Sequence, residues 1–207
     1  MKKPLVYNSK LEVEIVGSFQ TVDVERKSIK NQNFSGRELD ELRAAGCLFE
    51  DVILSQSEIS EGKVTDCIFT KCSFAGAELN NFFFERTEFK SSWMQGVQLS
   101  GALFRDCYFK SCKLNAANFR YGKFKNCTFD SCILHEIDFL GAQFENVDFL
   151  DCDLRESQFS QVTLKKVSLK GSQIAGISLG KEFLEEVTVD TAQAIYLASL
   201  FGLKIED

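Results

Sequence analysis

Large apolar residues recur at every fifth position through most of the chain. From Phe49 to Leu179 all 27 positions of this column are large and apolar, and 14 of them are Phe. A second column, two residues before the first, is small in 24 of its 27 positions, the exceptions being Phe82, Ile137 and Ile177. No charged residue falls in either column. A period of five fits neither an α-helix of period 3.6 nor a flat strand of period two. We therefore expect the chain to turn a corner every five residues.

Short segments such as CSFAG, CKLNA, ANFRY and CDLRE resemble the unit of the pentapeptide-repeat family, A(D/N)LXX. In that unit the central Leu or Phe is position i, and the small residue before it is i−2. The resemblance covers residues 47–181 without a frame slip, and weaker matches reach back to Phe34. It implies an all-β fold: a right-handed quadrilateral parallel β-helix of square, 20-residue coils stacked about 4.8 Å apart. Residues 34–181 then give between seven and eight coils.

The two columns are expected to fill the interior of this solenoid. Ladders of stacked rings are predicted at core i positions that include Phe69, Phe89, Phe109, Phe129, Phe149, Phe119, Phe139 and Phe159. Such ladders leave no room for a channel or a ligand. Eight of the 13 glycines fall at i+2, where some corners require a positive φ. A filled interior needs no cofactor, and we expect none.

Every cysteine occupies an i−2 position: Cys47, Cys67, Cys72, Cys107, Cys112, Cys127, Cys132 and Cys152. Buried thiols acting as small hydrophobic groups explain this placement. Cysteines 20 residues apart would stack on adjacent coils, within disulfide range, but parallel side chains do not naturally reach the disulfide torsion. A metal site is the remaining alternative, and the Cys-x4-Cys spacing does not favour it. We therefore expect no metal.

The chain is divided into three parts. Residues 1–33 are predicted to be an N-terminal capping segment, because Leu11, Val13 and Ile15, and later Val22 and Val24, alternate with polar residues. Residues 34–189 form the repeat region. Residues 190–207 form a C-terminal cap: Asp190 is a good N-cap, the following TAQAIYLASL has helical spacing, and Gly202 ends the helix. The final Leu-Lys-Ile has the composition of a further strand.

Two local features go beyond the repeat. In the first, NNFFFERTEFKSSWM, Phe82 fills a small-residue slot while Phe83 and Trp93 point outward. A β-bulge is favoured there over a contact patch. In the second, the C-terminal helix carries apolar side chains that either plug the coil or form a symmetric dimer contact. The side chains predicted for that contact are Ile195, Tyr196, Leu200 and Phe201.

The ending QAIYLASLFGLKI resembles the C-terminus of the Qnr-type fluoroquinolone-resistance proteins, above all those encoded on the chromosomes of Gram-positive bacteria. The resemblance implies a rod similar to B-form DNA in shape and charge, which forms a homodimer through the helix. It also implies binding to DNA gyrase and topoisomerase IV and their protection from quinolones. The uninterrupted frame leaves no place for the two projecting loops of the Gram-negative versions, so the chain looks like the loop-free branch.

The charge distribution is compatible with a basic protein partner and argues against direct binding of nucleic acid, since the net charge is −6. An acidic belt is predicted toward the C-terminal end: Asp130, Glu136, Asp138, Glu145, Asp148, Asp151, Asp153 and Glu156. A basic stretch between residues 105 and 125 precedes it. These belts either bind the partner or are simply the solvated outer surface.

Other functions find little support in the sequence. The single His makes a Ser-His-Asp triad improbable, and every inward polar group is a hydroxyl or a thiol, so we predict no catalytic residues and no enzyme. No apolar run of about 18 residues is present, and the N-terminus lacks a secretory apolar region. A cytoplasmic protein without membrane contact is expected. The main alternative to topoisomerase binding is a pentapeptide-repeat scaffold for another protein partner.

Overall fold

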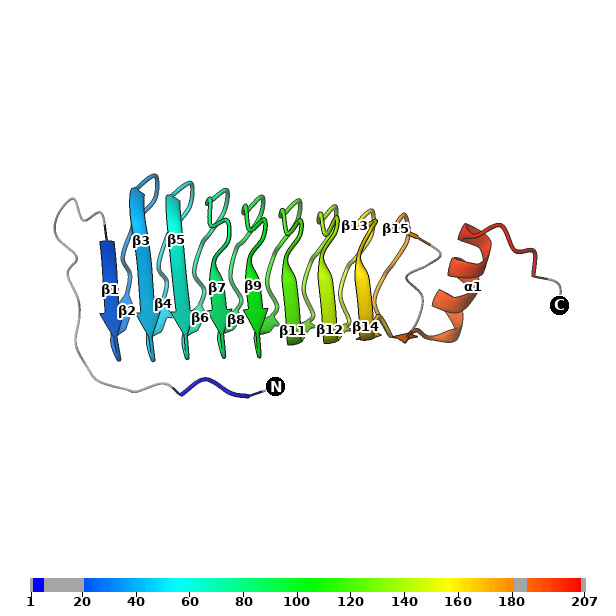
Figure 1. Cartoon of the computed structure of the whole chain (residues 1–207), viewed down its shortest axis with the longest axis horizontal. Coiled ribbons are helices and arrows are strands. Elements are labelled where there is room, and N and C mark those ends of the chain that lie inside the picture. The colour runs from blue at the N-terminus through cyan, green and yellow to red at the C-terminus, as the bar shows by residue number, and fades with distance from the viewer. Residues whose placement is uncertain (1, 6–20, 181–185, 206–207) are drawn as a thin grey trace.

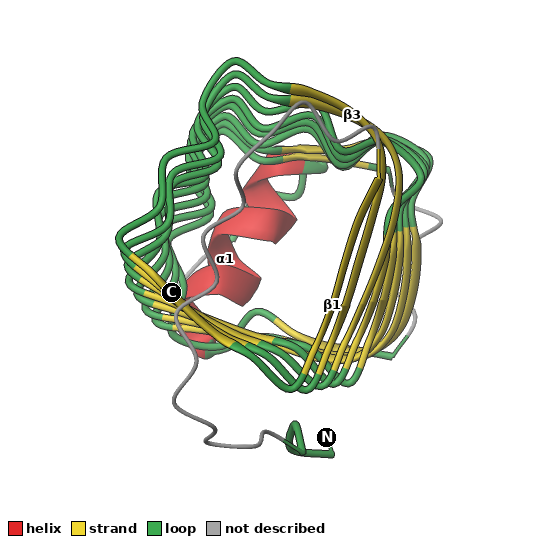
Figure 2. Ribbon diagram, turned by 90° about the vertical axis from the view of Figure 1, so that its left-hand side faces the viewer, coloured by secondary structure: helices red, strands yellow, loops and turns green. Residues whose placement is uncertain are grey.

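The protein winds into a straight rod of stacked square coils that one helix closes at the C-terminal end (Figures 1 and 2). These coordinates are a computed structural model that describes residues 2–5, 21–180 and 186–205. The elements are β1 Thr21–Glu25, β2 Ser28–Lys30, β3 Glu38–Ala45, β4 Leu48–Glu50, β5 Glu58–Thr65, β6 Ile68–Thr70, β7 Phe83–Glu85, β8 Glu88–Lys90, β9 Leu103–Arg105, β10 Tyr108–Lys110, β11 Lys123–Asp130, β12 Gln143–Leu150, β13 Gln158–Phe159, β14 Thr163–Ser168, β15 Ser178–Leu179, β16 Val187–Thr188 and α1 Thr191–Leu200.

Each strand pairs in parallel with the strand 20 residues further along the chain. Strand β3 pairs with β5 from Glu38↔Glu58 onward, and β11 pairs with β12 from Lys123↔Gln143 onward. Isolated bridges keep the same register between the strands, as in Trp93↔Lys113. The predicted 20-residue coil is therefore confirmed, and residues 21–180 make about eight coils.

The N-terminal boundary differs from the prediction. Strand β1 pairs with β3 and β2 pairs with β4, each at the 20-residue register. The strand expected at Val22 and Val24 therefore belongs to the first coil instead of a separate cap. The alternating Leu11, Val13 and Ile15 lie outside the described residues. At the other end, residues 203–205 form no strand, so the strand considered for the final Leu-Lys-Ile is absent there.

The square coil has four sides, which we number by their central i residues. The first side contains Phe49, Phe69 and Phe89; the second Leu54, Phe74 and Met94; the third Ile59, Leu79 and Leu99; the fourth Val64, Phe84 and Phe104. The corners at i+2 adopt a positive φ: all eight repeat glycines do so, and so do many other residues, including Asp51, Lys71 and Glu136. This left-handed turn lets the chain change direction every five residues.

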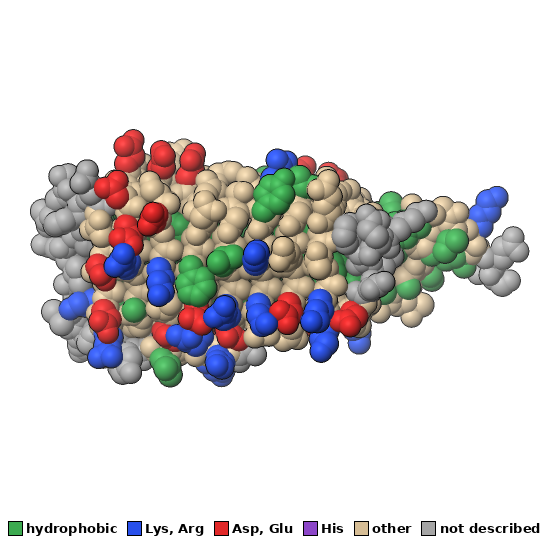
Figure 3. Space-filling view, viewed as in Figure 1, with side chains coloured by type: hydrophobic (Ala, Val, Ile, Leu, Met, Phe, Trp, Pro, Cys, Tyr) green, Lys and Arg blue, Asp and Glu red, His purple; other side chains and the backbone are tan. Residues whose placement is uncertain are grey.

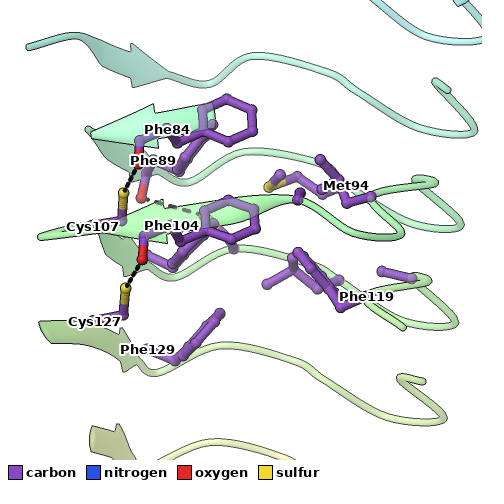
Figure 4. Packing of buried hydrophobic residues seen from close by; sticks show 14 of the residues in the cluster. Phe84, Phe89, Met94, Phe104, Cys107, Phe119, Cys127 and Phe129 are labelled. Atoms are coloured by element: carbon purple, nitrogen blue, oxygen red, sulfur yellow. Dashed lines mark hydrogen bonds between the residues drawn. The ribbon is translucent and has the colours of Figure 1, made fainter. Parts of the chain in front are cut away.

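Aromatic ladders fill the interior, as Figure 4 shows for part of the rod. On the first side the ring centroids of Phe89 and Phe109 are 4.8 Å apart, and those of Phe109 and Phe129 are 4.6 Å apart, with the rings within 7° of parallel. Rings on neighbouring sides meet edge to face, as Phe84 and Phe89 do at 5.6 Å. Both geometries are favourable for aromatic pairs.

The cysteines are buried free thiols on the corners of this core. Cys107 donates from Sγ to the carbonyl oxygen of Phe84 at 3.5 Å, and Cys127 donates to that of Phe104 at 3.6 Å (Figure 4). Ser157 uses its hydroxyl in the same way toward Leu134, at 3.1 Å. The i−2 side chains thus link each coil to the one before it. Burial raises the pKa of Cys107 well above its usual value.

Phe82 causes no bulge, so that prediction is wrong. The side chain is buried in its i−2 slot, and β7 keeps its register with β5 and β9 through Lys63↔Phe83 and Phe83↔Leu103. The reason is the glycine one coil earlier: a Cβ on Gly62 would lie 2.0 Å from Cε1 of Phe82. The absent side chain leaves the space that the ring fills.

Helix α1 closes the C-terminal end with the bounds that the sequence indicated. Asp190 accepts a hydrogen bond from the backbone N–H of Gln193, and the Gln193 side chain accepts one from the backbone of Asp190, which is a capping box. Gln193 also donates from Nε2 to the carbonyl oxygens of Leu169 and Ser172, at 2.6 and 2.7 Å. Leu197 is buried beside it. The helix is therefore fixed to the last complete coil.

Candidate interaction surface

The residues that face solvent are the i−1, i+1 and i+2 columns of each side, because i and i−2 point inward. Each outward column forms a ladder along the rod axis with one residue per coil. A cluster in the sequence therefore spreads around the rod, whereas residues 20 apart gather on one line. This geometry decides which of the predicted charges lie together.

The predicted acidic belt is distributed over all four sides. Its first-side members are Asp130, Asp148 and Asp151; its second-side members are Glu136, Asp153 and Glu156; Asp138 lies on the third side and Glu145 on the fourth. The structure therefore brings together at most three of the eight carboxylates on one side. The belt encircles the rod, and no single partner surface faces all of it.

Four of these carboxylates already have cationic partners. Arg155 binds Asp153 through two nitrogens at 2.8 and 2.7 Å. Arg120 binds Asp138 at 2.7 Å, and Lys125 binds Glu145 at 2.8 Å. Asp130 accepts from the Tyr108 hydroxyl and lies 3.7 Å from Lys110.

The pKa values of three of these carboxyl groups reflect the same contacts. Hydrogen bonding to Arg155 lowers the pKa of Asp153, that to Lys125 lowers the pKa of Glu145, and that to Tyr108 lowers the pKa of Asp130. The belt thus presents less free charge than its composition indicated.

A denser acidic surface lies at the N-terminal end of the third side. Glu38, Glu58 and Glu78 occupy the same column on three successive coils, in direct register. All three are exposed, and none makes an ion pair with a residue that the structure describes. Asp40, Glu41 and Glu61 extend this acidic ladder on the same side. Figure 3 shows Asp and Glu side chains gathered along the upper edge of that end.

The acidic ladder could have been found by taking outward residues at intervals of 20 instead of in sequence windows. Within a window of 27 residues, Glu38, Glu58 and Glu78 never occur together. In-register like charges destabilise a sheet, so a column of three carboxylates is not what packing alone favours. We regard it as the stronger acidic surface.

The C-terminal helix presents an apolar outer face. Ile195 is 51% exposed and Leu200 is 44% exposed. Of the other two residues predicted for a dimer contact, Phe201 is half-buried, and Tyr196 is engaged within the chain because its hydroxyl accepts a hydrogen bond from Gly176 N at 2.7 Å. Tyr196 thus takes part in closing the coil, while Ile195 projects on the opposite side of the helix from buried Gln193 and Leu197.

One group of possible metal ligands occurs in the described part of the chain. His135 lies between Glu136 and Glu156, with 3.9 Å from an imidazole nitrogen to an oxygen of each. One ligand atom from each of the three lies within 4.8 Å of the others. Ligands at about 2.0–2.2 Å from a zinc ion lie closer together than that. We assign these residues no metal.

Two family models match the repeat region. One, described as a pentapeptide repeat region, matches residues 102–179, and the other, pentapeptide repeats in eight copies, matches residues 67–106. Together they extend over more than half of the chain. The chain belongs to the pentapeptide-repeat family. A comparison with the curated proteins gives no significant match.

Several solved structures share this architecture. A trypsin-treated variant of QnrB1, a plasmid-mediated fluoroquinolone resistance protein, is 23% identical with a TM-score of 0.48, covering 90% of this chain and 95% of that one. HetL, which is involved in heterocyst differentiation regulation in the cyanobacterium Nostoc, is 13% identical with a TM-score of 0.40, covering 81% and 86%. At these identities the likeness concerns the repeat architecture and does not distinguish the functions of the two proteins. No helix in the described residues has the length and apolar character to span a membrane.

Proposed function

We propose that this pentapeptide-repeat protein binds type II topoisomerases, DNA gyrase or topoisomerase IV, in place of DNA and protects them from quinolones. The observation that carries the proposal is the acidic ladder on a straight rod. Six carboxylates occupy three coils, which at about 4.8 Å per coil is roughly one charge per 2.4 Å. Duplex DNA carries one per about 1.7 Å. A basic surface that binds DNA would therefore meet a comparable line of charge.

The C-terminal residues give independent support. The segment QAIYLASLFGLKI resembles the closing helix of the Qnr-type proteins, and the helix it forms exposes Ile195 and Leu200. We propose that this outer face forms the symmetric homodimer contact. Two rods joined end to end would lengthen the DNA-like body and place one acidic ladder at each far end. Nothing in this function requires catalysis.

Gyrase supercoiling in the presence of ciprofloxacin, with and without the purified protein, tests the proposal. We expect rescue at a low molar excess of native protein. The variant Glu58→Gln with Glu78→Gln removes two charges while introducing the residue that the same column uses next, Gln98. This variant should lose most of the rescue and unfold at a slightly higher temperature, because the like-charge repulsion is relieved.

Matched variants separate the surfaces. Asp23→Asn with Asp51→Asn removes two exposed charges from other sides of the same end and should leave rescue intact. Asp148→Asn with Asp151→Asn tests the acidic belt, and we expect a smaller loss. Should only this belt variant lose rescue, the ladder assignment is wrong. Absence of rescue by the native protein would exclude protection of that enzyme.

A second candidate is a scaffold that binds another protein. The observation that favours it is the mixed charge of the rod, since basic residues concentrate on the fourth side, which includes Lys63, Lys123 and Lys165. A DNA substitute gains nothing from a cationic side. Native protein that fails to rescue gyrase, yet remains folded, would favour this second function.

A further inference from the structure

A groove runs along the fourth side of the rod, parallel to its axis. Its walls are two outward ladders: Phe83, Leu103, Lys123, Gln143 and Thr163 on one side, and Arg105, Lys125, Glu145 and Lys165 on the other. The backbone around Phe104, Phe124 and Phe144 forms its floor. The enclosed volume is about 360 Å³. Figure 3 looks onto this side of the molecule and shows a row of alternating basic and acidic side chains along it.

The groove is basic although the protein as a whole is acidic. Four of its side chains, Arg105, Lys123, Lys125 and Lys165, are cationic and exposed, against the single carboxylate of Glu145. Lys125 pairs with Glu145, whereas Lys123 and Lys165 make no ion pair with any residue that the structure describes. The free positive charge is therefore concentrated inside the groove.

One end of the groove is apolar. Phe83 and Leu103 are adjacent in one wall, in direct register on neighbouring coils, and Leu103 is 39% exposed. From this end to Thr163 the groove extends over four coil steps, about 19 Å. That length accommodates about six residues of extended polypeptide, at roughly 3.3 Å per residue.

The same side already accommodates an extended segment running along the axis. Lys2 donates from its backbone N to Asp106 at 3.2 Å, and Leu5 donates from its backbone N to Asp66 at 3.1 Å. Asp66 and Asp106 lie two coils apart in the i+2 column that borders the groove. Asp66 is also bound by Arg86 through two nitrogens, each at 2.7 Å. These contacts engage the nearby carboxylates, so the adjacent groove keeps its positive charge.

We propose that this groove binds an extended acidic segment of a protein partner, with one large apolar side chain seated at Phe83 and Leu103. A single-stranded nucleic acid fits less well. Glu85 and Glu145 interrupt the cationic wall, where a continuous phosphate backbone would meet them. The half-buried ring of Phe83 lies under the guanidinium of Arg105, 5.9 Å from its centroid, so it offers no open face for a base.

This site is distinct from the acidic ladder, and its charge is opposite, so it does not depend on the proposed function. The test is fluorescence anisotropy with a fluorescein-labelled peptide of six glutamates followed by one leucine. We expect saturable binding at about 50 mM salt that weakens steeply as salt is raised, because charge attraction supplies much of the affinity. Replacing the leucine of the probe with glycine should weaken binding several-fold.

Variants locate the binding. Lys123→Glu with Lys165→Glu should weaken peptide binding at least tenfold. Lys123→Gln with Lys165→Thr should weaken it less and preserve the fold, since Gln143 and Thr65 occupy the same two columns. Lys71→Glu with Lys113→Glu makes the same charge change on the first and second sides and should leave binding within twofold.

Three results would overturn the proposal: no binding by the native protein, equal loss in the control variant, or no loss in either groove variant. A labelled 12-nucleotide thymidine strand is the comparison probe. If it binds as tightly as the peptide, with the same dependence on Lys123 and Lys165, the groove is a nucleic-acid site and the peptide assignment is wrong.

Discussion

At the scale of single residues, the fit between Gly62 and Phe82 shows how this solenoid tolerates an oversized side chain. The ring occupies the space above a glycine one coil earlier, and both residues sit in the small-residue column. We predict that Gly62→Ala lowers the free energy of unfolding by about 1–3 kcal/mol, the usual cost of overpacking a filled core. Chemical denaturation followed by circular dichroism measures the change.

A double-mutant cycle tests the cause of this loss. Phe82→Ala alone should cost about 3–5 kcal/mol, because it leaves a cavity. In that background Gly62→Ala should be neutral or stabilising, since the added methyl group enters the empty space. A loss of similar size in both backgrounds would show that Gly62 is required for its backbone conformation and not for the ring.

The buried thiols predict a dependence of stability on alkaline pH. Burial raises the pKa of Cys72 from 9.0 to about 12. Unfolded chains therefore lose the thiol proton at lower pH than folded ones. The stabilisation is complete below about pH 9 and is lost as pH rises toward 12, at up to ~1.4 kcal/mol per unit for each such thiol. Denaturant titrations at pH 8, 9 and 10 measure it.

Cys72→Ser serves as the reference, because Ser92 occupies the same slot in the next coil. Other groups titrate in the same range, but they are common to both proteins. The stability of the native protein relative to the variant should therefore fall between pH 9 and 10. A constant difference would mean that this thiol ionises equally easily in the folded coil.

The sequence predicts the interior almost completely, because a period of five assigns every residue to an inward or outward column. Its failure at Phe82 has a physical reason. The glycine that accommodates the ring lies 20 residues earlier, so a local reading sees only an oversized residue in a small slot. Tyr196 is similar: its partner, Gly176 N, also lies 20 residues away and belongs to the end of the coil.

At the scale of elements, helix α1 depends on one buried amide. Gln193 donates to two carbonyl oxygens of the last coil and completes the capping box. We predict that Gln193→Ala destabilises this end by roughly 1–3 kcal/mol, because buried hydrogen-bonding groups lose their partners. Amide exchange of Ile177, which measures local opening, should accelerate by about ten- to a hundredfold.

The control is Gln173→Ala, which removes the same side chain from an exposed position on the second side. Exchange near the N-terminal coils should be unchanged in both variants, since each coil contacts only its neighbours. Uniform acceleration along the whole rod in Gln193→Ala would contradict a local closing role and indicate that α1 controls global stability.

The helix itself was predictable from local signals, namely Asp190 before a run of helical spacing and Gly202 after it. The start of the coil was not, because residues 21–30 match the frame only weakly and pair through registers set by β3 and β4. Backbone pairing tolerates such divergence as long as the 20-residue spacing is kept.

At the scale of the whole molecule, charge is organised by side and not by position along the chain. Contiguous acidic residues such as Asp148 and Glu156 end up on different sides, whereas Glu38, Glu58 and Glu78 form one line. The predicted belt was a property of the sequence window, and half of its charge is paired. Assigning surfaces in a solenoid therefore requires the coil length first, and only then the charges.

The proposed dimer is a prediction at this same scale. Ile195 lies opposite buried Gln193 and Leu197 on α1, so a charge there leaves the contacts with the coil intact. We expect Ile195→Asp to shift the protein from dimer to monomer in sedimentation equilibrium, because an unpaired carboxylate would be buried in the contact. Leu200→Asp should act in the same direction.

Tyr196→Asp is the less informative change, since it also removes the hydrogen bond to Gly176 and disturbs the closed end. Ala175→Asp, an exposed position on the second side of the rod, is the matched control and should remain dimeric. A native protein that sediments as a monomer at all accessible concentrations would refute the dimer. A dimer that survives both Ile195→Asp and Leu200→Asp would place its contact elsewhere on the rod. In that case one candidate is an antiparallel pairing of rods, with the basic fourth side of each against the acidic ladder of the other, and raised salt should then dissociate it.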